Sequence, residues 1–187
     1  MGLVRWLALI AFVVLVACGG TPALIAVSEP TAEGRVRVSV ASVELKEPSL
    51  PGYALADEIP LEEEGGLVNV VEAVLWADKP ARAISLELTR HLSALTRVRV
   101  ASAPWPFEAQ PDASLDVRFE TLLARADGRF QASGQYFVAR LDGGRERSGF
   151  FDLSETIAQP ATAQSISDAR GRVIRALAEL LAREALR

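Results

Sequence analysis

Apolar residues along this chain recur with two periods, one typical of strands and one typical of helices. In residues 36–40, valines alternate with polar side chains, which predicts a half-buried strand. The valine-rich segment 67–75 predicts a second strand, and the alternation in 97–100 predicts a short third one. Residues 55–66 contain Pro60 and three adjacent glutamates, so we expect them to form an irregular acidic loop.

A longer alternating region predicts a meander of three antiparallel strands. Residues 115–121 place apolar side chains on one face and charged side chains on the other. The Asp-Gly pair at 127–128 favours a tight hairpin, because a type I′ turn needs positive φ. The chain then returns over 130–141, turns at the Asp-Gly-Gly segment 142–144 and forms the third strand over 146–153.

Two amphipathic helices are predicted, one before and one after the meander. The first begins near Asp78, the expected N-cap, and has Pro80 in its first turn. The second begins at a cap supplied by Ser165 or Ser167. Their apolar stripes, at three- and four-residue spacing, are Ala81, Ile84, Leu88, Leu92 and Leu95 in the first helix and Val173, Leu177 and Leu180 in the second.

Arg82 and Arg90 lie off the apolar stripe of the first helix. Glu87 lies off the stripe of the first helix. The i,i+4 pairs expected on the solvent side of the second helix are Asp168–Arg172 and Glu179–Arg183. The order of elements, β-β-α-β-β-β-β-α, predicts an α+β fold in which a mainly antiparallel sheet carries two amphipathic helices on one face.

The N-terminus has the pattern of a bacterial lipoprotein signal. Arg5 precedes an apolar run that ends in Leu15-Val16-Ala17-Cys18. The thiolate of Cys18 would accept a diacylglyceryl group, and the small Ala17 leaves room for the peptidase. Because a membrane-spanning helix needs about 20 apolar residues, this run is too short to span comfortably. We therefore predict a signal peptide at 1–17, with an uncleaved N-terminal anchor as the alternative.

The remaining chain divides into a tether and one domain. Residues 18–34 are predicted to be the lipidated Cys18 followed by a flexible tether, although the apolar Leu24, Ile25 and Val27 leave open a short docked strand. Residues 35–187 are predicted to form a single domain. Cys18 is the only cysteine, so packing without disulfides must stabilise that domain. The net charge of −4 gives no support for nucleic-acid binding.

Motifs for catalysis and metal binding are absent from the sequence. His91 is the only histidine, and we expect it at the edge of the core because nothing supplies a triad or zinc-ligand spacing. The glutamates 62–64 are adjacent in a predicted loop, where such runs are usually solvated. No phosphate-binding glycine loop or nucleophile elbow occurs. We expect a protein that is not an enzyme, with no cofactor and no metal.

Two tryptophans favour different roles. Trp76 precedes the first helix and is predicted to lie in the core or to cover it. Trp105 lies in a loop stiffened by two prolines, where its ring either packs on its own sheet or anchors a neighbouring subunit or partner. The candidate interface residues are Trp105, Pro104, Pro106, Phe107 and Tyr53.

Several segments occur in an order that points to a known family. They are Leu50-Pro51-Gly52-Tyr53-Ala54-Leu55-Ala56-Asp57, Leu75-Trp76-Ala77-Asp78-Lys79-Pro80, the helical run from Ile84 to Leu95, Trp105-Pro106, Asp116-Val117-Arg118-Phe119-Glu120 and the C-terminal helix rich in alanine and leucine. Together they resemble the PqiC-type lipoproteins, the ABC-type transport auxiliary lipoprotein family. The resemblance spans 36–187; the extra Ala54 after Tyr53 and the acidic insert at 62–64 depart from it.

The resemblance implies a lipoprotein on the periplasmic face of the outer membrane of a diderm bacterium, anchored through acyl chains on Cys18. Gly19 agrees, since an aspartate there would favour retention in the inner membrane. Family members accompany MCE-domain systems that move lipids or other hydrophobic molecules. The implied partners are a periplasmic MCE-domain protein and, because a small domain surrounds a conduit only by repetition, further copies in a ring. The alternative is a structural envelope-integrity lipoprotein without cargo contact.

Overall fold

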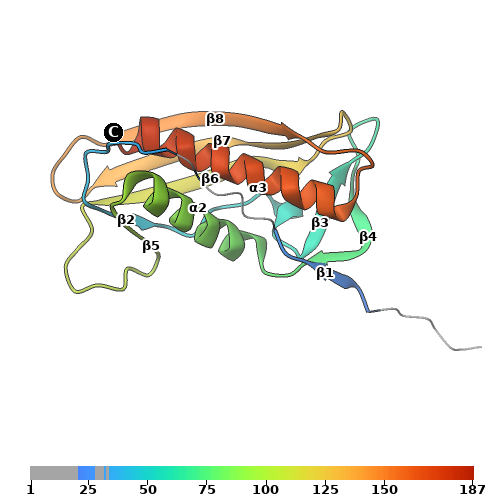
Figure 1. Cartoon of the computed structure of the whole chain (residues 1–187), viewed down its shortest axis with the longest axis horizontal. Helices are drawn as coiled ribbons and strands as arrows, with labels where there is room; N and C mark the ends of the chain where they lie inside the picture. The colour runs from blue at the N-terminus through green and yellow to red at the C-terminus, as the bar shows by residue number, and fades with distance from the viewer. Residues whose placement is uncertain (1–20, 28–31, 33) are drawn as a thin grey trace, which may run out of the picture.

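A long antiparallel meander backed by two helices dominates the structure (Figure 1). The computed structural model describes residues 21–27, 32 and 34–187. The elements are β1 (Ala23–Ile25), β2 (Ser42–Leu45), the 3-10 turn η1 (Gly52–Ala54), β3 (Glu58–Glu62), β4 (Val68–Trp76), α2 (Pro80–Thr96), β5 (Arg99–Ser102), β6 (Ala113–Ala124), β7 (Arg129–Arg140), β8 (Arg147–Thr156), α3 (Ala163–Leu180) and the π-helical turn η2 (Leu181–Ala185). The predicted α+β class and the mainly antiparallel sheet are confirmed.

The sheet is organised around β6. Along one edge β6 pairs antiparallel with β7, which pairs antiparallel with β8. Along its other edge β6 pairs in parallel with β2 near its start and with β3 at its end. β2 continues in parallel to β5, while β3 continues antiparallel to β4 and then in parallel to β1. Two short branches of the sheet therefore attach to opposite ends of one long strand.

The meander and its turns lie where the sequence predicts them. The Asp-Gly turn at 127–128 joins β6 to β7, and Gly128 has a φ of 79°. The β6–β7 register shifts between Phe119 and Thr121, opposite Gly134. A Cβ at Gly134 would lie 2.0 Å from the carbonyl oxygen of Arg118. Only glycine therefore allows the two strands to approach at this irregularity.

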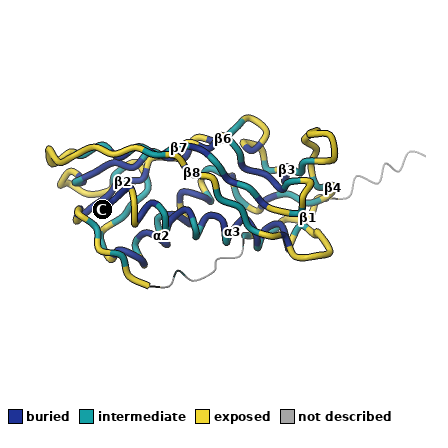
Figure 2. The backbone as a smooth tube through the Cα atoms, turned by 90° about the horizontal axis from the view of Figure 1, so that it is seen from above, coloured by how far each residue is buried: buried dark blue, intermediate teal, exposed yellow. Residues whose placement is uncertain are grey.

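The core lies between the sheet and the helix layer (Figure 2). Ile84, Leu88 and Leu92 of the first stripe are fully buried, as are Val173 and Leu177 of the second. The predicted stripes therefore face the sheet, and both helices cover one face of it, as expected. None of the described helices is long and apolar enough to cross a membrane.

The predicted strand at 36–40 is wrong. This segment is extended but pairs with no strand, and β2 begins only at Ser42. Its backbone instead reaches the ends of the helices: the Val36 N–H donates to the Leu95 carbonyl and the Ser39 N–H to the Leu186 carbonyl, each at 2.9 Å. The valines still alternate in burial because every second side chain faces the helices. The period-two pattern therefore reflects which side chains pack against the core, and it does not show that the segment pairs with a neighbouring strand.

The predicted acidic loop at 55–66 is also wrong, because it contains β3. Ile59 of this strand is fully buried, and Glu62 forms an ion pair with Arg125 at 2.8 Å. The acidic residues that suggested a loop lie at the exposed end of the β3–β4 hairpin. Only the tip, 63–67, turns the chain.

The helix starts differ from those predicted. Lys79, not Asp78, is the N-cap of α2, and the Asp78 carboxylate accepts a hydrogen bond from the Lys79 N–H at 2.8 Å. Thr162, not a serine, caps α3; its hydroxyl accepts from the Ser165 N–H at 3.1 Å, and the Ser165 hydroxyl accepts from the Thr162 N–H at 2.8 Å. A reciprocal capping box provides acceptors for two backbone N–H groups that have no partner within the helix. This explains why Thr162, and not one of the later serines, is the N-cap.

The two predicted ion pairs of the second helix have different outcomes. Glu179 and Arg183 lie 3.4 Å apart, so this pair is confirmed. Arg172 instead contacts Glu155 of β8 at 3.4 Å, while Asp168 accepts a hydrogen bond from Gln164. A cross-element contact therefore replaces the predicted local pair at the start of the helix.

The apolar segment near the N-terminus forms the docked strand that the sequence left open. Ala23, Leu24 and Ile25 pair in parallel with the last three residues of β4. The Ser167 hydroxyl of α3 donates to the Ala26 carbonyl at 3.1 Å. The predicted signal peptide and Cys18 lie outside the described residues.

Replacing Leu177 with aspartate is expected to unfold the protein. Leu177 is fully buried in α3, and a carboxylate there would lack a partner. The cost of several kcal/mol is comparable to the whole stability of a domain, about 5–15 kcal/mol. Thermal unfolding followed by circular dichroism measures the effect. The control is Glu179→Gln, which removes only a partly exposed ion pair and should change the melting temperature little; equal melts for the two variants would contradict this placement of the helix face.

Candidate functional site

A pocket opens where β1, the end of β4 and the first half of α2 meet. Its volume is about 250 Å³. Most of its lining is apolar, from Ile25, Val27, Trp76, Pro80 and Leu86. The docking of β1 beside β4 creates one wall, so the pocket depends on the segment that sequence patterns assigned to a tether.

A buried ion pair lies at the inner side of this pocket. The Arg170 Nη1 of α3 lies 3.1 Å from the Glu87 Oε1 of α2, and the two side chains are only 3% and 5% exposed. The Arg170 guanidinium also lies over the Trp76 ring, 5.1 Å from its centroid. One arginine therefore connects both helices to the end of β4. A cation over an indole face is attracted by the ring quadrupole, which adds to the charge pairing.

The lining of the pocket is mainly apolar, with Asp78, Glu87, Arg90 and Arg170 as its charged members. Among the described residues that line it, none is serine, threonine, cysteine or histidine. Its buried cation, Arg170, is compensated by Glu87. The volume is below the range of about 300–1,000 Å³ typical of small-molecule sites.

The described residues contain no group of three or more histidine, cysteine, aspartate or glutamate side chains arranged to hold a metal ion. His91 is buried in α2, and Trp76 is buried at the end of β4. Both residues were predicted at the core, and the structure places them there. Trp76 has a second role, because its ring also lines the pocket.

The Trp105 loop joins β5 to β6 at the end of the molecule away from β4. Its indole N–H donates to the Ala109 carbonyl at 2.7 Å, and its ring meets Phe107 edge to face, with centroids 5.0 Å apart. The Trp105 backbone N–H donates to a carboxylate oxygen of Glu44 at 3.0 Å. The ring therefore packs within its own loop and remains half-exposed, and Pro104, Pro106 and Phe107 are exposed. The interface role stays a prediction.

Tyr53 has a structural contact that the sequence did not indicate. Its hydroxyl oxygen accepts a hydrogen bond from the Leu122 N–H of β6 at 3.2 Å. This contact fills a gap in the edge of β6 between the bridge made by Ser49 and the pairing with β3. Burial raises the pKa of the Tyr53 hydroxyl, so it stays protonated at neutral pH.

Tyr53 and Trp105 do not form one surface. Trp105 is bound to Glu44, which pairs with Ser114 near the start of β6. Leu122, the partner of Tyr53, lies about 26 Å further along β6 at ~3.3 Å per residue. The five candidate interface residues therefore fall into two places. Four lie in the loop near the start of β6, and Tyr53 lies beside Leu122 near the end of β6.

The ion pair between Glu87 and Arg170 was missed by sequence analysis, although one indication was present. Arg170 follows Ile166 by four residues and precedes Val173 by three, so it falls on the apolar stripe of α3. A charged residue on such a stripe predicts a buried partner. The identity of that partner depends on how α2 and α3 pack against each other, and the local sequence pattern of either helix does not predict this packing.

Neutralising one member of the buried pair is expected to destabilise the fold more than removing both. Glu87→Gln leaves Arg170 uncompensated and should lower the free energy of unfolding by about 3–5 kcal/mol. The double variant Glu87→Leu with Arg170→Met removes both charges at similar volume and should stay near the wild type. Urea unfolding at neutral pH measures both. A double variant as unstable as Glu87→Gln would contradict this account, because removing the uncompensated Arg170 charge would then restore no stability.

One family model matches most of the sequence. It is described as ABC-type transport auxiliary lipoprotein component and matches residues 24–183. The matched region contains the ion pair and the Trp105 loop, together with nearly all of β1. None of the curated proteins compared matches the chain.

Solved structures share the fold at low sequence identity. A crystal structure of an uncharacterized protein is 15% identical over 87% of this chain and 97% of that chain, with a TM-score of 0.71. Protein XCC0632 from Xanthomonas campestris, of family DUF330, is 12% identical over 85% of this chain and 91% of that chain, with a TM-score of 0.72. At these identities the likeness establishes the fold alone.

Proposed function

Because this chain belongs to the family of ABC-type transport auxiliary lipoprotein components, we propose that it is an outer-membrane lipoprotein serving an MCE-type envelope transport system. Acyl chains on Cys18 hold it on the periplasmic face of the membrane. Its folded domain docks a periplasmic MCE-domain protein. The transported molecules are lipids or other hydrophobic compounds, and the protein acts by binding, not as an enzyme.

The family match is the observation that supports this proposal most directly. It confirms the resemblance to PqiC-type lipoproteins inferred from the order of the sequence motifs. The lipobox ends at Cys18, just before the matched region begins at residue 24. An anchor followed at once by the family domain is the organisation that the proposed role requires.

The pocket supports a binding role. It is small, mainly apolar and lined by none of the usual nucleophiles among its described residues. Covalent catalysis needs a nucleophile and a base in mutual reach. A pocket of this kind suits contact with a hydrophobic group, which agrees with a component of a lipid-handling system.

The Trp105 loop supports docking of a partner or of further copies. Its backbone is fixed to β2 through Glu44, and Arg99 lies over the Phe107 ring at 4.8 Å. An aromatic pair fixed before binding loses little conformational entropy on association. Repetition of the subunit around a conduit would place one such loop on each copy.

Two single substitutions test the anchor and its destination. Cys18→Ser should abolish incorporation of labelled palmitate, because serine offers no thiolate to acylate. Gly19→Asp should keep the label but move the protein to the inner membrane in a density gradient. If Cys18→Ser is labelled like the wild type, the protein is not a lipoprotein anchored at Cys18. If labelled wild-type protein fractionates with the inner membrane, the proposed outer-membrane location is wrong.

Replacing Trp105 with alanine tests the docking role. In the mature lipidated protein it should weaken capture of the MCE-domain partner, or self-association, by about 2 kcal/mol, roughly thirtyfold in Kd. The melting temperature should stay near that of the wild type, because the hydrogen bond to Ala109 and the edge-to-face contact with Phe107 both lie within the loop. Analytical ultracentrifugation and partner titration measure the two properties.

The matched control is Phe150→Ala, which removes an exposed aromatic ring from β8. It should leave association unchanged. A large fall in the melting temperature of Trp105→Ala would make the ring a structural residue. Unchanged association in both variants would exclude the loop as the docking surface and favour a structural lipoprotein.

A further inference from the structure

The docking of β1 shortens the connection between the folded domain and the anchor. Ile25 is fixed to the domain, because the Ala77 N–H donates to its carbonyl at 2.8 Å. Ala23 already pairs with Val74 of β4. Lipidation of Cys18 belongs to the proposed function, and the present argument rests on it. Four residues lie between Cys18 and Ala23, and the five fully extended steps from one to the other span only about 17 Å.

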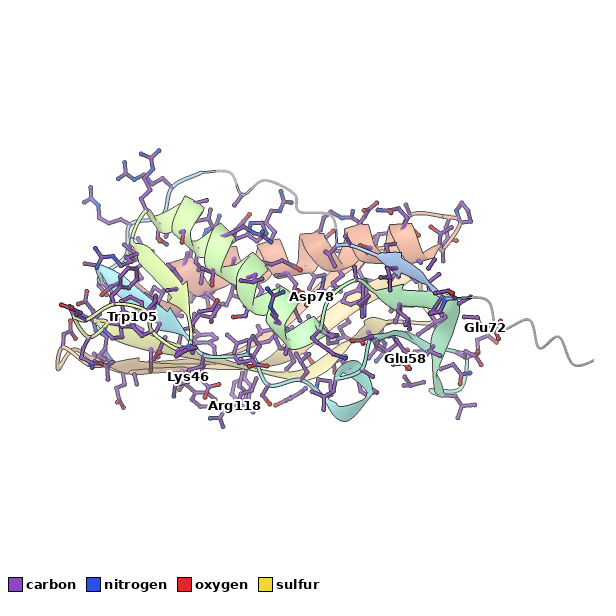
Figure 3. All side chains as sticks on the ribbon, turned by 90° about the horizontal axis from the view of Figure 1, so that it is seen from below. Lys46, Glu58, Glu72, Asp78, Trp105 and Arg118 are labelled. Atoms are coloured by element: carbon purple, nitrogen blue, oxygen red, sulfur yellow. The ribbon has the colours of Figure 1, made fainter. Side chains whose placement is uncertain are left out.

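This short connection determines which end of the molecule faces the membrane. β1, β3 and β4 lie together at one end, and the Trp105 loop lies at the other (Figures 1 and 3). A domain attached through β1 by so few residues cannot turn its far end toward the bilayer without lifting the anchor out. The β1 and β3–β4 end therefore lies closest to the lipid surface.

The same end exposes apolar side chains that the fold does not use. Leu24 of β1 and Leu67 at the tip of the β3–β4 hairpin are each 67% exposed. Val68 and Val70 of β4 are also exposed. β1 pairs only with 74–76, so the outer edge of β4 before Val74 has no neighbouring strand among the described residues. The hairpin thus projects from the sheet as an arm with apolar side chains at its end.

Charges on the arm restrict the kind of surface that it fits. Glu63 and Glu64 at the tip are exposed. Glu58 and Glu72 on the strands are exposed as well (Figure 3). Glu62 differs, because Arg125 compensates it at 2.8 Å. Exposed carboxylates are repelled by anionic lipid headgroups and are tolerated among zwitterionic ones, whose ammonium groups lie at the surface.

We propose that the tip of the β3–β4 arm forms a second membrane contact, in which Leu67 and Val68 enter the headgroup region of a zwitterionic bilayer. Leu67 lies eight residues before Leu75, the partner of Leu24, so this contact is about 26 Å along β4 from β1, at ~3.3 Å per residue. Apolar side chains at this depth add to the affinity of the acyl chains, and two attachments fix the orientation of the domain. The Trp105 end then points away from the membrane.

A fluorescent probe on the arm tests this contact in the full mature lipoprotein. With Cys18 acylated, Leu67→Cys provides the only free thiol, and an environment-sensitive dye such as NBD is attached to it. The matched control is Leu141→Cys in the β7–β8 turn, a leucine 55% exposed and outside the arm. Both proteins are reconstituted in phosphatidylcholine vesicles. Nitroxide-labelled lipids then report which probe touches the bilayer.

The expected result is a blue-shifted emission and at least threefold stronger nitroxide quenching at position 67 than at position 141. Replacing a third of the lipid with phosphatidylglycerol should reduce both effects. Equal quenching at the two positions overturns the proposal, as does a blue shift at position 67 without quenching, which would mark a protein contact instead. Mass spectrometry separates this failure from that of the anchor: a protein without acyl chains refutes lipidation, whereas an acylated protein with an unquenched arm refutes only the second contact.

Discussion

Hydrogen bonding along both edges of β6 is the constraint on which the rest of the structure depends. One edge pairs with β7 along its whole length except at the irregularity between Phe119 and Thr121. The other is satisfied in turn by β2, by Ser49, by the Tyr53 hydroxyl and by β3. Because a buried strand cannot leave its N–H and C=O groups unpaired, these segments from distant parts of the chain are held in one order. That order sends the β3–β4 arm and the Trp105 loop to opposite ends.

The helix layer adds a second constraint through one buried charge pair. Glu87 and Arg170 connect α2 to α3, and the stacking of Arg170 on Trp76 connects both to the end of β4. Buried pairs of this kind cost desolvation and often add little stability. Their geometry nevertheless specifies how the helices sit relative to the strand that β1 joins. The pocket wall therefore depends on the contact between Glu87, Arg170 and Trp76, which matters more for positioning these elements than for stabilising the fold.

The two ends of the molecule differ in chemistry. The end with β1 and β4 combines exposed leucines and valines with exposed glutamates, while the other end presents an aromatic loop. In the proposed arrangement the first end lies against the membrane that carries Cys18, and the second faces the periplasm. A transport component needs such polarity, because it must contact a membrane on one side and a soluble partner on the other.

Local sequence determined the elements whose pattern and environment agree. The meander, its Asp-Gly turn, both amphipathic helices and the fold class follow from periodicity and turn chemistry, and the ordered motifs identified the family. Contacts between distant parts of the chain determined the segments whose structure differs from what their sequence pattern predicts. Residues 36–40 alternate like a strand yet bond to helix ends, and Glu58–Glu62 looks like a loop yet pairs with β4 and β6. Glu87 and Arg170 meet only because two helices pack together. Periodicity records which side of a segment is buried, whereas the partner that buries it is chosen by contacts between residues far apart in the chain.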